Sequence, residues 1–172
     1  MRTLLVVSLG WSLVGCGKLL FGSGTVFVWN GTDRRQEVVV DGRSSDSFTI
    51  PSHSGERIDA VAGKYRVVQG QRVYEFDLKG DTTVVVNLGS EACFARADIS
   101  GMYQPGKERV RLVQTYDRGD VLTFDPEVPV LPGEPPPATR PRSSYGLQRL
   151  SDVPCNLLRD EAAMSDWVRR SH

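Results

Sequence analysis

The chain has 172 residues, and its 40% hydrophobic and 24% charged content is typical of one folded domain with short appendages. Its 21 Lys and Arg residues balance its 21 Asp and Glu residues, so no excess of positive charge favours a phosphate backbone or an anionic surface as ligand. We therefore expect no nucleic acid among its partners.

The N-terminal segment MRTLLVVSLGWSLV carries one positive charge, at Arg2, followed by an apolar run that ends at Val14. A basic residue followed by a short apolar stretch and small residues is typical of an export signal. A transmembrane helix needs about 20 apolar residues, and this run is shorter because glycines and Lys18 interrupt it. We therefore predict a signal peptide over residues 1–15.

The apolar run ends in Leu13-Val14-Gly15-Cys16, which resembles the lipobox of bacterial lipoproteins. The resemblance implies that the signal peptide is cut before Cys16, that its thiol is joined to a diacylglycerol, and that the new amino terminus is acylated, for example by palmitate. The two acyl chains of the diacylglycerol and the one on the amino terminus together hold a protein stably on a membrane. An ordinary cleaved signal with an incidental cysteine is the alternative.

The residue after Cys16 is Gly17 rather than Asp. In lipoproteins that resemble enterobacterial ones, this implies delivery to the outer membrane, facing the periplasm or the cell surface. Residues 16–24 then form the lipidated cysteine and a short tether, which keeps the folded part close to the bilayer because each residue spans at most about 3.5 Å.

From Thr25 onward, short β-branched runs alternate with turn signals. Strands are predicted at residues 25–29, 36–40, 47–50, 57–61, 64–68, 73–78 and 82–88. The turns between them contain Asn30-Gly31, Asp41-Gly42, Ala62-Gly63, Gln69-Gly70 and Lys79-Gly80, whose glycines supply the positive φ of tight hairpins. Strands at this spacing without helices predict an all-β fold, an antiparallel β-sandwich with one wet and one dry face.

A further β section contains residues 92–99 and a predicted hairpin of residues 109–116 and 120–124, which turns at Asp117-Arg118-Gly119. In the hairpin, Val110 and Leu112 are expected to face inward. The sandwich domain is therefore predicted over residues 25–125.

Residues 25–88 resemble the small PEGA-type sandwich of bacterial envelope proteins. The resemblance is carried by Val38-Val39-Val40-Asp41-Gly42, by Ala62-Gly63-Lys64-Tyr65-Arg66-Val67 and by Thr83-Val84-Val85-Val86-Asn87-Leu88. It implies an Ig-like or PEGA-like sandwich and says almost nothing about function.

Residues 126–150 are predicted to form a Pro-rich extended segment. Prolines at 126, 129, 132 and 135 recur every three residues, which is the period of polyproline II. Val128 and Leu131 share another edge, which predicts a strap lying on the sheet; a linker or a PxxP peptide ligand is the alternative.

The C-terminal residues 151–172 are predicted to contain one amphipathic helix, most clearly over residues 154–170. Met164, Trp167 and Val168 fall on one face of such a helix. This face either docks onto the β domain or binds a partner, in which case Trp167 is the expected anchor and Met164 lies beside it.

With Cys16 lipidated, Cys93 and Cys155 remain, an even number in a chain exported to an oxidising compartment. We therefore predict a disulfide between them. A closed loop of about 60 residues contributes on the order of 4 kcal/mol, and the bond staples the helix to the β domain.

The sequence offers little for catalysis. Its two histidines are His53 and His172, and neither Ser52 nor Ser54 lies in a nucleophile-elbow motif. We interpret His53 as a solvated loop residue and predict no catalytic residues.

Metal-binding motifs such as CxxC, HExxH and the EF-hand loop are absent from the sequence, and Asp33, Asp41 and Asp46 are interpreted as turn residues. We therefore expect neither a metal nor a cofactor.

Together these patterns predict a membrane-anchored envelope lipoprotein that acts as a non-catalytic binding or structural module. Its expected partners are membrane lipid, through Cys16, and an envelope protein, whereas the oligomeric state is left open. The alternatives are an exported hydrolase with an unrecognised site and an accessory subunit of an envelope complex, which would expose an apolar patch at Trp29 or Trp167.

Overall fold

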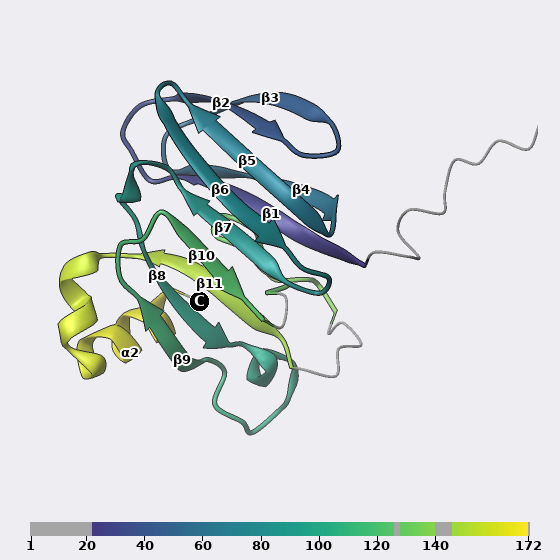
Figure 1. Ribbon diagram of the computed structural model, residues 1–172. Helices are drawn as coiled ribbons and strands as arrows, with labels where there is room; N and C mark the ends of the chain where they lie inside the picture. The colour runs from purple at the N-terminus through teal and green to yellow at the C-terminus, as the bar shows by residue number, and fades with distance from the viewer. Residues whose placement is uncertain (1–21, 126–127, 140–145, 172) are drawn as a thin grey trace, which may run out of the picture.

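The computed structural model describes residues 22–125, 128–139 and 146–171 (Figure 1). The described chain is mostly β and ends in one α-helix. Its strands are β1 (Ser23–Asn30), β2 (Gln36–Asp41), β3 (Ser45–Ile50), β4 (Ser54–Val61), β5 (Gly63–Gln69), β6 (Arg72–Leu78), β7 (Thr83–Asn87), β8 (Cys93–Asp98), β9 (Arg111–Tyr116), β10 (Val121–Phe124) and β11 (Gln148–Val153). Short 3-10 turns η1 (Leu88–Ser90), η2 (Ser100–Tyr103) and η3 (Cys155–Arg159) and the helix α2 (Glu161–Arg170) complete it.

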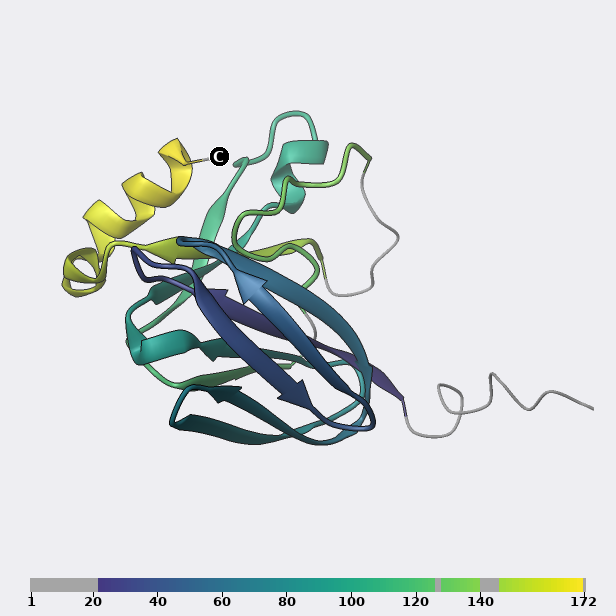
Figure 2. The ribbon, with the colours of Figure 1, turned by 90° about the horizontal axis from the view of Figure 1, so that it is seen from above.

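The strands form three small sheets, which we name by position. The outer sheet has the order β3-β2-β5-β6, the central sheet β10-β7-β1-β4, and the helix-side sheet β11-β8-β9. The outer sheet and α2 lie at opposite ends of the molecule (Figure 1), and the view from above looks down onto the outer sheet with β1 beneath it (Figure 2). The sheets are therefore stacked, and β1 and β7 of the central sheet are buried on both faces.

The central sheet explains the continuous apolar runs of β1 and β7. Val26 and Val28 of β1 pack toward the outer sheet, whereas Phe27 and Trp29 pack toward the helix-side sheet. β7 lies parallel to β1, and every residue of β7 is buried. Parallel strands with two covered faces are typically apolar throughout, so the prediction of a purely antiparallel sandwich with one wet face is wrong for this pair.

The outer sheet follows the predicted alternation. Val67 of β5 faces the core, whereas Arg66 points outward, where its guanidinium lies 2.8 Å from the Asp41 carboxylate. Gly70, at φ 57°, closes the tight β5–β6 hairpin as predicted. Gly42 instead has a packing role, because a Cβ there would lie 2.2 Å from the Tyr65 ring.

The prediction of a hairpin turn at Asn30-Gly31 is wrong, because β1 pairs with β4 and β7 and not with β2. Asn30 is fully buried, and its Nδ2 donates to the carbonyl oxygens of Arg34 (2.7 Å), Ile50 (3.1 Å) and Pro51 (2.8 Å). One buried amide thus holds together the loops that lead into β2 and out of β3.

The predicted hairpin of residues 109–116 and 120–124 is also wrong. β9 pairs with β8, and β10 crosses to the central sheet and pairs with β7. Burial explains the difference, since Phe124 is 1% exposed and packs with the apolar side chains between the two sheets. β9 carries a bulge opposite Arg96 and Ala97, which leaves Val113 exposed.

Residues 128–131 of the Pro-rich segment pack into the core. Val128, Val130 and Leu131 are at most 3% exposed, and the Val130 carbonyl accepts a hydrogen bond from the β11 N–H of Leu150 at 2.9 Å. Glu134 closes the turn, where its Oε2 accepts from the Leu131 N–H at 2.8 Å and its Oε1 lies 3.4 Å from Arg57 Nη1. These contacts are those of a strap rather than of a free linker.

The C-terminal helix is shorter than predicted. Residues 148–153 form β11, which pairs with β8, and α2 covers only residues 161–170. Pro154 follows β11, and Asp160 sets the start of α2 because its Oδ1 accepts from the Ala163 N–H at 2.9 Å. The prediction of an extended segment to residue 150 and a helix from residue 151 is therefore wrong at this boundary.

Candidate functional site

The predicted lipidation site, Cys16, lies outside the residues that the structure describes. The other predicted cysteine site is present, since Cys93 and Cys155 form a disulfide with a Cα–Cα distance of 5.2 Å. Cys93 is fully buried at the start of β8, and Cys155, at the start of η3, is half-buried. The prediction of this bond is confirmed, and it joins η3 to the helix-side sheet.

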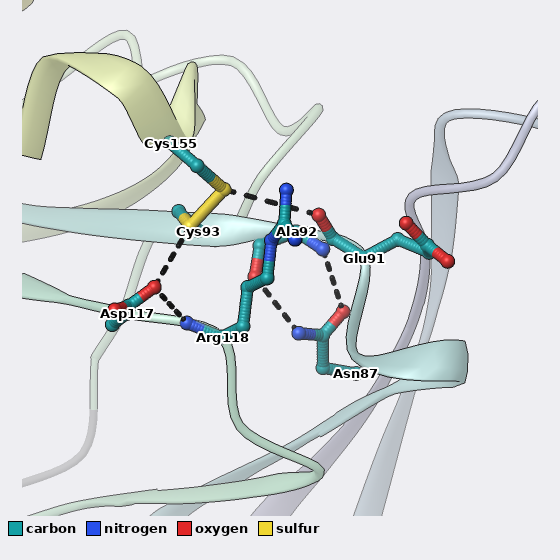
Figure 3. The surroundings of a disulfide bond; sticks show 7 residues. All are labelled: Asn87, Glu91, Ala92, Cys93, Asp117, Arg118 and Cys155. Carbon is teal, nitrogen blue, oxygen red and sulfur yellow. Dashed lines mark hydrogen bonds between the residues drawn. A yellow bond between two sulfur atoms is a disulfide. The ribbon is translucent and has the colours of Figure 1, made fainter.

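The disulfide lies beside the turn between β9 and β10 (Figure 3). Asp117 Oδ1 is 3.6 Å from Cys93 Sγ and accepts a hydrogen bond from the Arg118 N–H at 2.7 Å. The oxidised sulfur carries no proton, so its approach to Asp117 is a contact and becomes an S–H···O hydrogen bond only in the reduced protein.

Asn87 closes the link between β7 and β8. Its fully buried side chain donates to the Ala92 carbonyl at 2.9 Å and accepts from the Ala92 N–H at 3.2 Å (Figure 3). Sequence reasoning missed this residue and treated it as the end of an apolar strand. An asparagine that ends a buried run is the signal that could have identified it, because a buried amide needs partners.

A cleft of about 610 Å³ opens beside the disulfide. It is lined by Asp117, Arg118, Cys155, Asn156, Leu158 and Arg159. The β9–β10 turn supplies the first two of these residues, and η3 supplies the other four. The residues that line the cleft therefore include one leucine and one half-cystine beside two arginines, an aspartate and an asparagine.

An unrecognised hydrolase site would require catalytic side chains to converge on His53. His53 Nε2 lies 2.9 Å from Asp33 Oδ1, but both side chains are solvated, at 58% and 96% exposure. The Ser54 hydroxyl donates to the Pro51 carbonyl at 2.9 Å and not to the histidine. The structure thus gives His53 a carboxylate partner without an activated serine.

Asp152 of β11 is a half-buried carboxyl that sequence reasoning did not single out. Burial raises its pKa above the ordinary value, and the neighbouring Trp29 side chain and the charge of His53 act against that rise. A carboxyl with a raised pKa near a histidine is a feature of some catalytic sites, although structural residues show it too. Asp152 lines neither the cleft beside the disulfide nor the concavity of the outer sheet.

The outer sheet carries a shallow concavity of about 570 Å³, among whose lining residues are Asp41, Arg66 and Glu75. Asp41 is already bound by the Ser45 hydroxyl at 2.6 Å and by Arg66 at 2.8 Å. Hydrogen bonds from these two residues lower the pKa of Asp41. The Asp41 and Arg66 charges of this surface are therefore paired with each other within the sheet.

The two residues considered as a partner-binding pair differ in position. Met164 is 1% exposed and packs in the core between α2 and the helix-side sheet, whereas Trp167 lies partly exposed at the edge of that cluster. Met164 could contact a partner only if α2 left the sheet. Trp29, named for an exposed patch, is buried at 4% exposure.

Within residues 22–125, 128–139 and 146–171, no three His, Cys, Asp or Glu side chains are placed to hold a metal ion. Of the helices in these ranges, none has the length and apolar character needed to cross a bilayer. Comparisons with protein-family models, curated proteins and solved structures found no match.

Proposed function

We propose that the chain is a bacterial envelope lipoprotein, anchored through Cys16, whose β region acts as a non-catalytic binding or structural module. The observation that carries the proposal is the sequence Leu13-Val14-Gly15-Cys16 at the end of a short apolar run that follows a basic residue. Gly17 after the cysteine favours the outer membrane as the destination.

The disulfide supports export. Disulfides persist in oxidising compartments such as the bacterial periplasm and are rare in the cytosol. The chain has three cysteines, and because Cys93 and Cys155 pair with each other, Cys16 is the remaining thiol. A single remaining thiol directly after the small residues of a signal peptide fits its use as an attachment point.

We also propose that residues 25–88 form a PEGA-type, Ig-like sandwich. The supporting contact is the packing of Val26 and Val84 of the central sheet against Val40 and Val67 of the outer sheet. An experimental structure of the mature protein tests this proposal through the strand order of the two sheets.

The anchor is tested by the mass of the mature N-terminus after expression of the full chain in a Gram-negative host. We expect a chain that begins at Cys16, carries a diacylglycerol and an N-acyl group, and sediments with membranes. The matched control is Cys16→Ser, which should remain soluble or uncleaved. An unmodified Cys16 in the wild-type protein would contradict the proposal.

An exported hydrolase is the second candidate, favoured by the 2.9 Å contact between His53 and Asp33 and by the raised pKa of nearby Asp152. Purified protein is assayed against ester, amide and glycoside substrates, with His53→Ala as the comparison. Turnover that disappears in His53→Ala would establish the enzyme, and the binding module predicts equal, background rates for both proteins.

A further inference from the structure

The cleft beside the disulfide carries two guanidinium groups with no protein partner. Arg118 and Arg159 are both exposed and line this cleft. Within the described part of the chain, neither guanidinium makes a hydrogen bond or an ion pair. By contrast, Arg66 is paired with Asp41, and Arg169 with Glu108. The two cleft arginines are therefore available to an external anion.

The carboxylates nearest in sequence to these arginines bind other donors. Asp117 accepts from the backbone N–H of Arg118 at 2.7 Å, Asp120 accepts from the Ser90 hydroxyl, and Asp160 caps α2. Among the lining residues, two arginines and one aspartate leave one uncompensated positive charge. A single positive charge suits a carboxylate rather than a polyanion, since Asp117 repels dense negative charge.

The two arginines come from separate segments, and the disulfide bonds the η3 segment to β8 beside the turn that carries Arg118. Cys155 begins the η3 turn that contains Arg159, and it is bonded to Cys93 of β8. Cys93 in turn lies 3.6 Å from Asp117, the neighbour of Arg118 (Figure 3). A cleft whose two sides are held before binding loses less conformational entropy when a ligand is captured.

We propose that this cleft binds one carboxylate side chain on an extended segment of a partner protein. Arg118 and Arg159 hold the carboxylate, as guanidinium groups do through paired N–H donors. Leu158 and the disulfide contact the aliphatic carbons beside it, and Asn156 offers an amide to the peptide backbone. The proposal rests on the binding role proposed above and names the chemistry of the partner.

The test uses the purified mature protein and a fluorescent ten-residue peptide of Ala and Ser with one Glu at its centre. Arg118→Gln and Arg159→Gln should each weaken binding about five- to tenfold, the loss expected for one charge-assisted contact at a partly exposed site. Arg34→Gln and Arg35→Gln are the controls, since both arginines are exposed, neither lines the cleft, and their loss should leave the affinity unchanged. The same peptide with Gln in place of Glu should not bind.

Equal losses in the cleft and control variants would overturn the proposal, because they would indicate non-specific charge attraction. Equal binding of the Glu and Gln peptides would also overturn it. Far-UV circular dichroism of each variant identifies misfolding, and Arg118→Lys and Arg159→Lys should retain part of the affinity in a folded protein.

A further measurement separates this proposal from the binding role on which it rests. A photo-crosslinking residue is placed in cells at Asn156, within the cleft, and at Val73, which is 51% exposed on the outer sheet. Capture of a partner segment that contains a carboxylate from Asn156, lost in Arg118→Gln, supports the cleft. Capture from Val73 alone would overturn the cleft proposal and leave the binding role standing, whereas capture from neither position would contradict both.

Discussion

At the residue scale, two aspartates give opposite contributions to the pH dependence of stability. The pKa of Asp41 is lowered by hydrogen bonds from Ser45 and Arg66, whereas burial raises the pKa of Asp152. A carboxyl whose pKa is lowered in the folded state stabilises the fold when the pH is above the ordinary pKa, and this effect is lost as the pH falls through the lowered pKa. A carboxyl whose pKa is raised destabilises the fold when the pH is above the ordinary pKa, because the folded protein then holds the proton more tightly than the unfolded chain.

Asp152→Asn should therefore increase the free energy of unfolding at pH 7, where the buried carboxylate is destabilising. The gain should stay below about 1 kcal/mol because the group is partly exposed, and it should vanish near pH 3, below the ordinary carboxyl range of about 4. Urea unfolding at both pH values measures it. Asp41→Asn is the opposite control, with a loss of stability at pH 7 that becomes smaller as the pH falls below the ordinary carboxyl pKa; a gain from Asp152→Asn that persists at pH 3 would contradict this account.

Gly101→Ala should also destabilise the fold, because the backbone passes close to Gly101. A Cβ at Gly101 would lie 1.8 Å from the Glu108 carbonyl oxygen, so the η2 turn would have to move away from residues 108–109. We expect a loss of about 1–3 kcal/mol, visible as a lower melting temperature. Gly80→Ala is the control, since its nearest contact is 3.4 Å, and equal losses in the two variants would show that the close approach is not responsible.

At the scale of elements, the disulfide and the β8–β11 ladder hold the same end of the helix-side sheet. Val153 of β11 pairs with Cys93, two residues before Cys155. The double variant Cys93→Ala with Cys155→Ala should lose about 2–4 kcal/mol, chiefly because the unfolded chain gains freedom. Denaturant unfolding measures the loss, and hydrogen exchange should still find β11 protected. Rapid exchange throughout β11 would mean that the bond, rather than the ladder, forms this sheet.

Local patterns in the sequence predicted most of the strands but not how they assemble. Alternation in residues 64–68 and 73–78 predicted β5 and β6, because one face is buried and the other is wet. The partner of β10 depends on where Phe124 finds a buried site, and the parallel β1–β7 pair joins residues distant along the chain. Local sequence patterns therefore predict neither the partner of β10 nor the pairing of β1 with β7.

The candidate site shows the same division. Once Cys16 is assigned to lipidation, parity of the two other cysteines is enough to predict the Cys93–Cys155 bond. The cleft beside it was not predictable, since Arg118 and Arg159 come from segments far apart in the sequence, which the pairing of β9 and β11 with β8 brings together. Asp152 was missed because its carboxyl is perturbed by burial, by Trp29 of β1 and by His53 of the β3–β4 turn.

At the scale of the whole molecule, the predicted boundary at residue 125 cuts through a shared core. Val128, Leu131 and Leu150 lie beyond it and pack against Phe27 and Phe94. A chain that ends at residue 125 should therefore lose cooperative unfolding, whereas one that ends at residue 159, without α2, should keep it with reduced stability. Urea titrations followed by tryptophan fluorescence compare the two, and a sharp transition in the shorter chain would show that residues 25–125 fold independently.

The burial of β1 on both faces has a consequence for biogenesis. β1 is an early part of the folded region, yet its first partner, β4, follows only at residues 54–61 and its parallel neighbour, β7, only at residues 83–87. Pairings between distant segments form slowly and leave apolar strands exposed meanwhile. Under the export route proposed above, residues 26–29 would leave the translocation channel before the other strands and would stay exposed as an apolar, aggregation-prone segment until their partners arrive. The protein should consequently depend on a periplasmic holding chaperone during secretion.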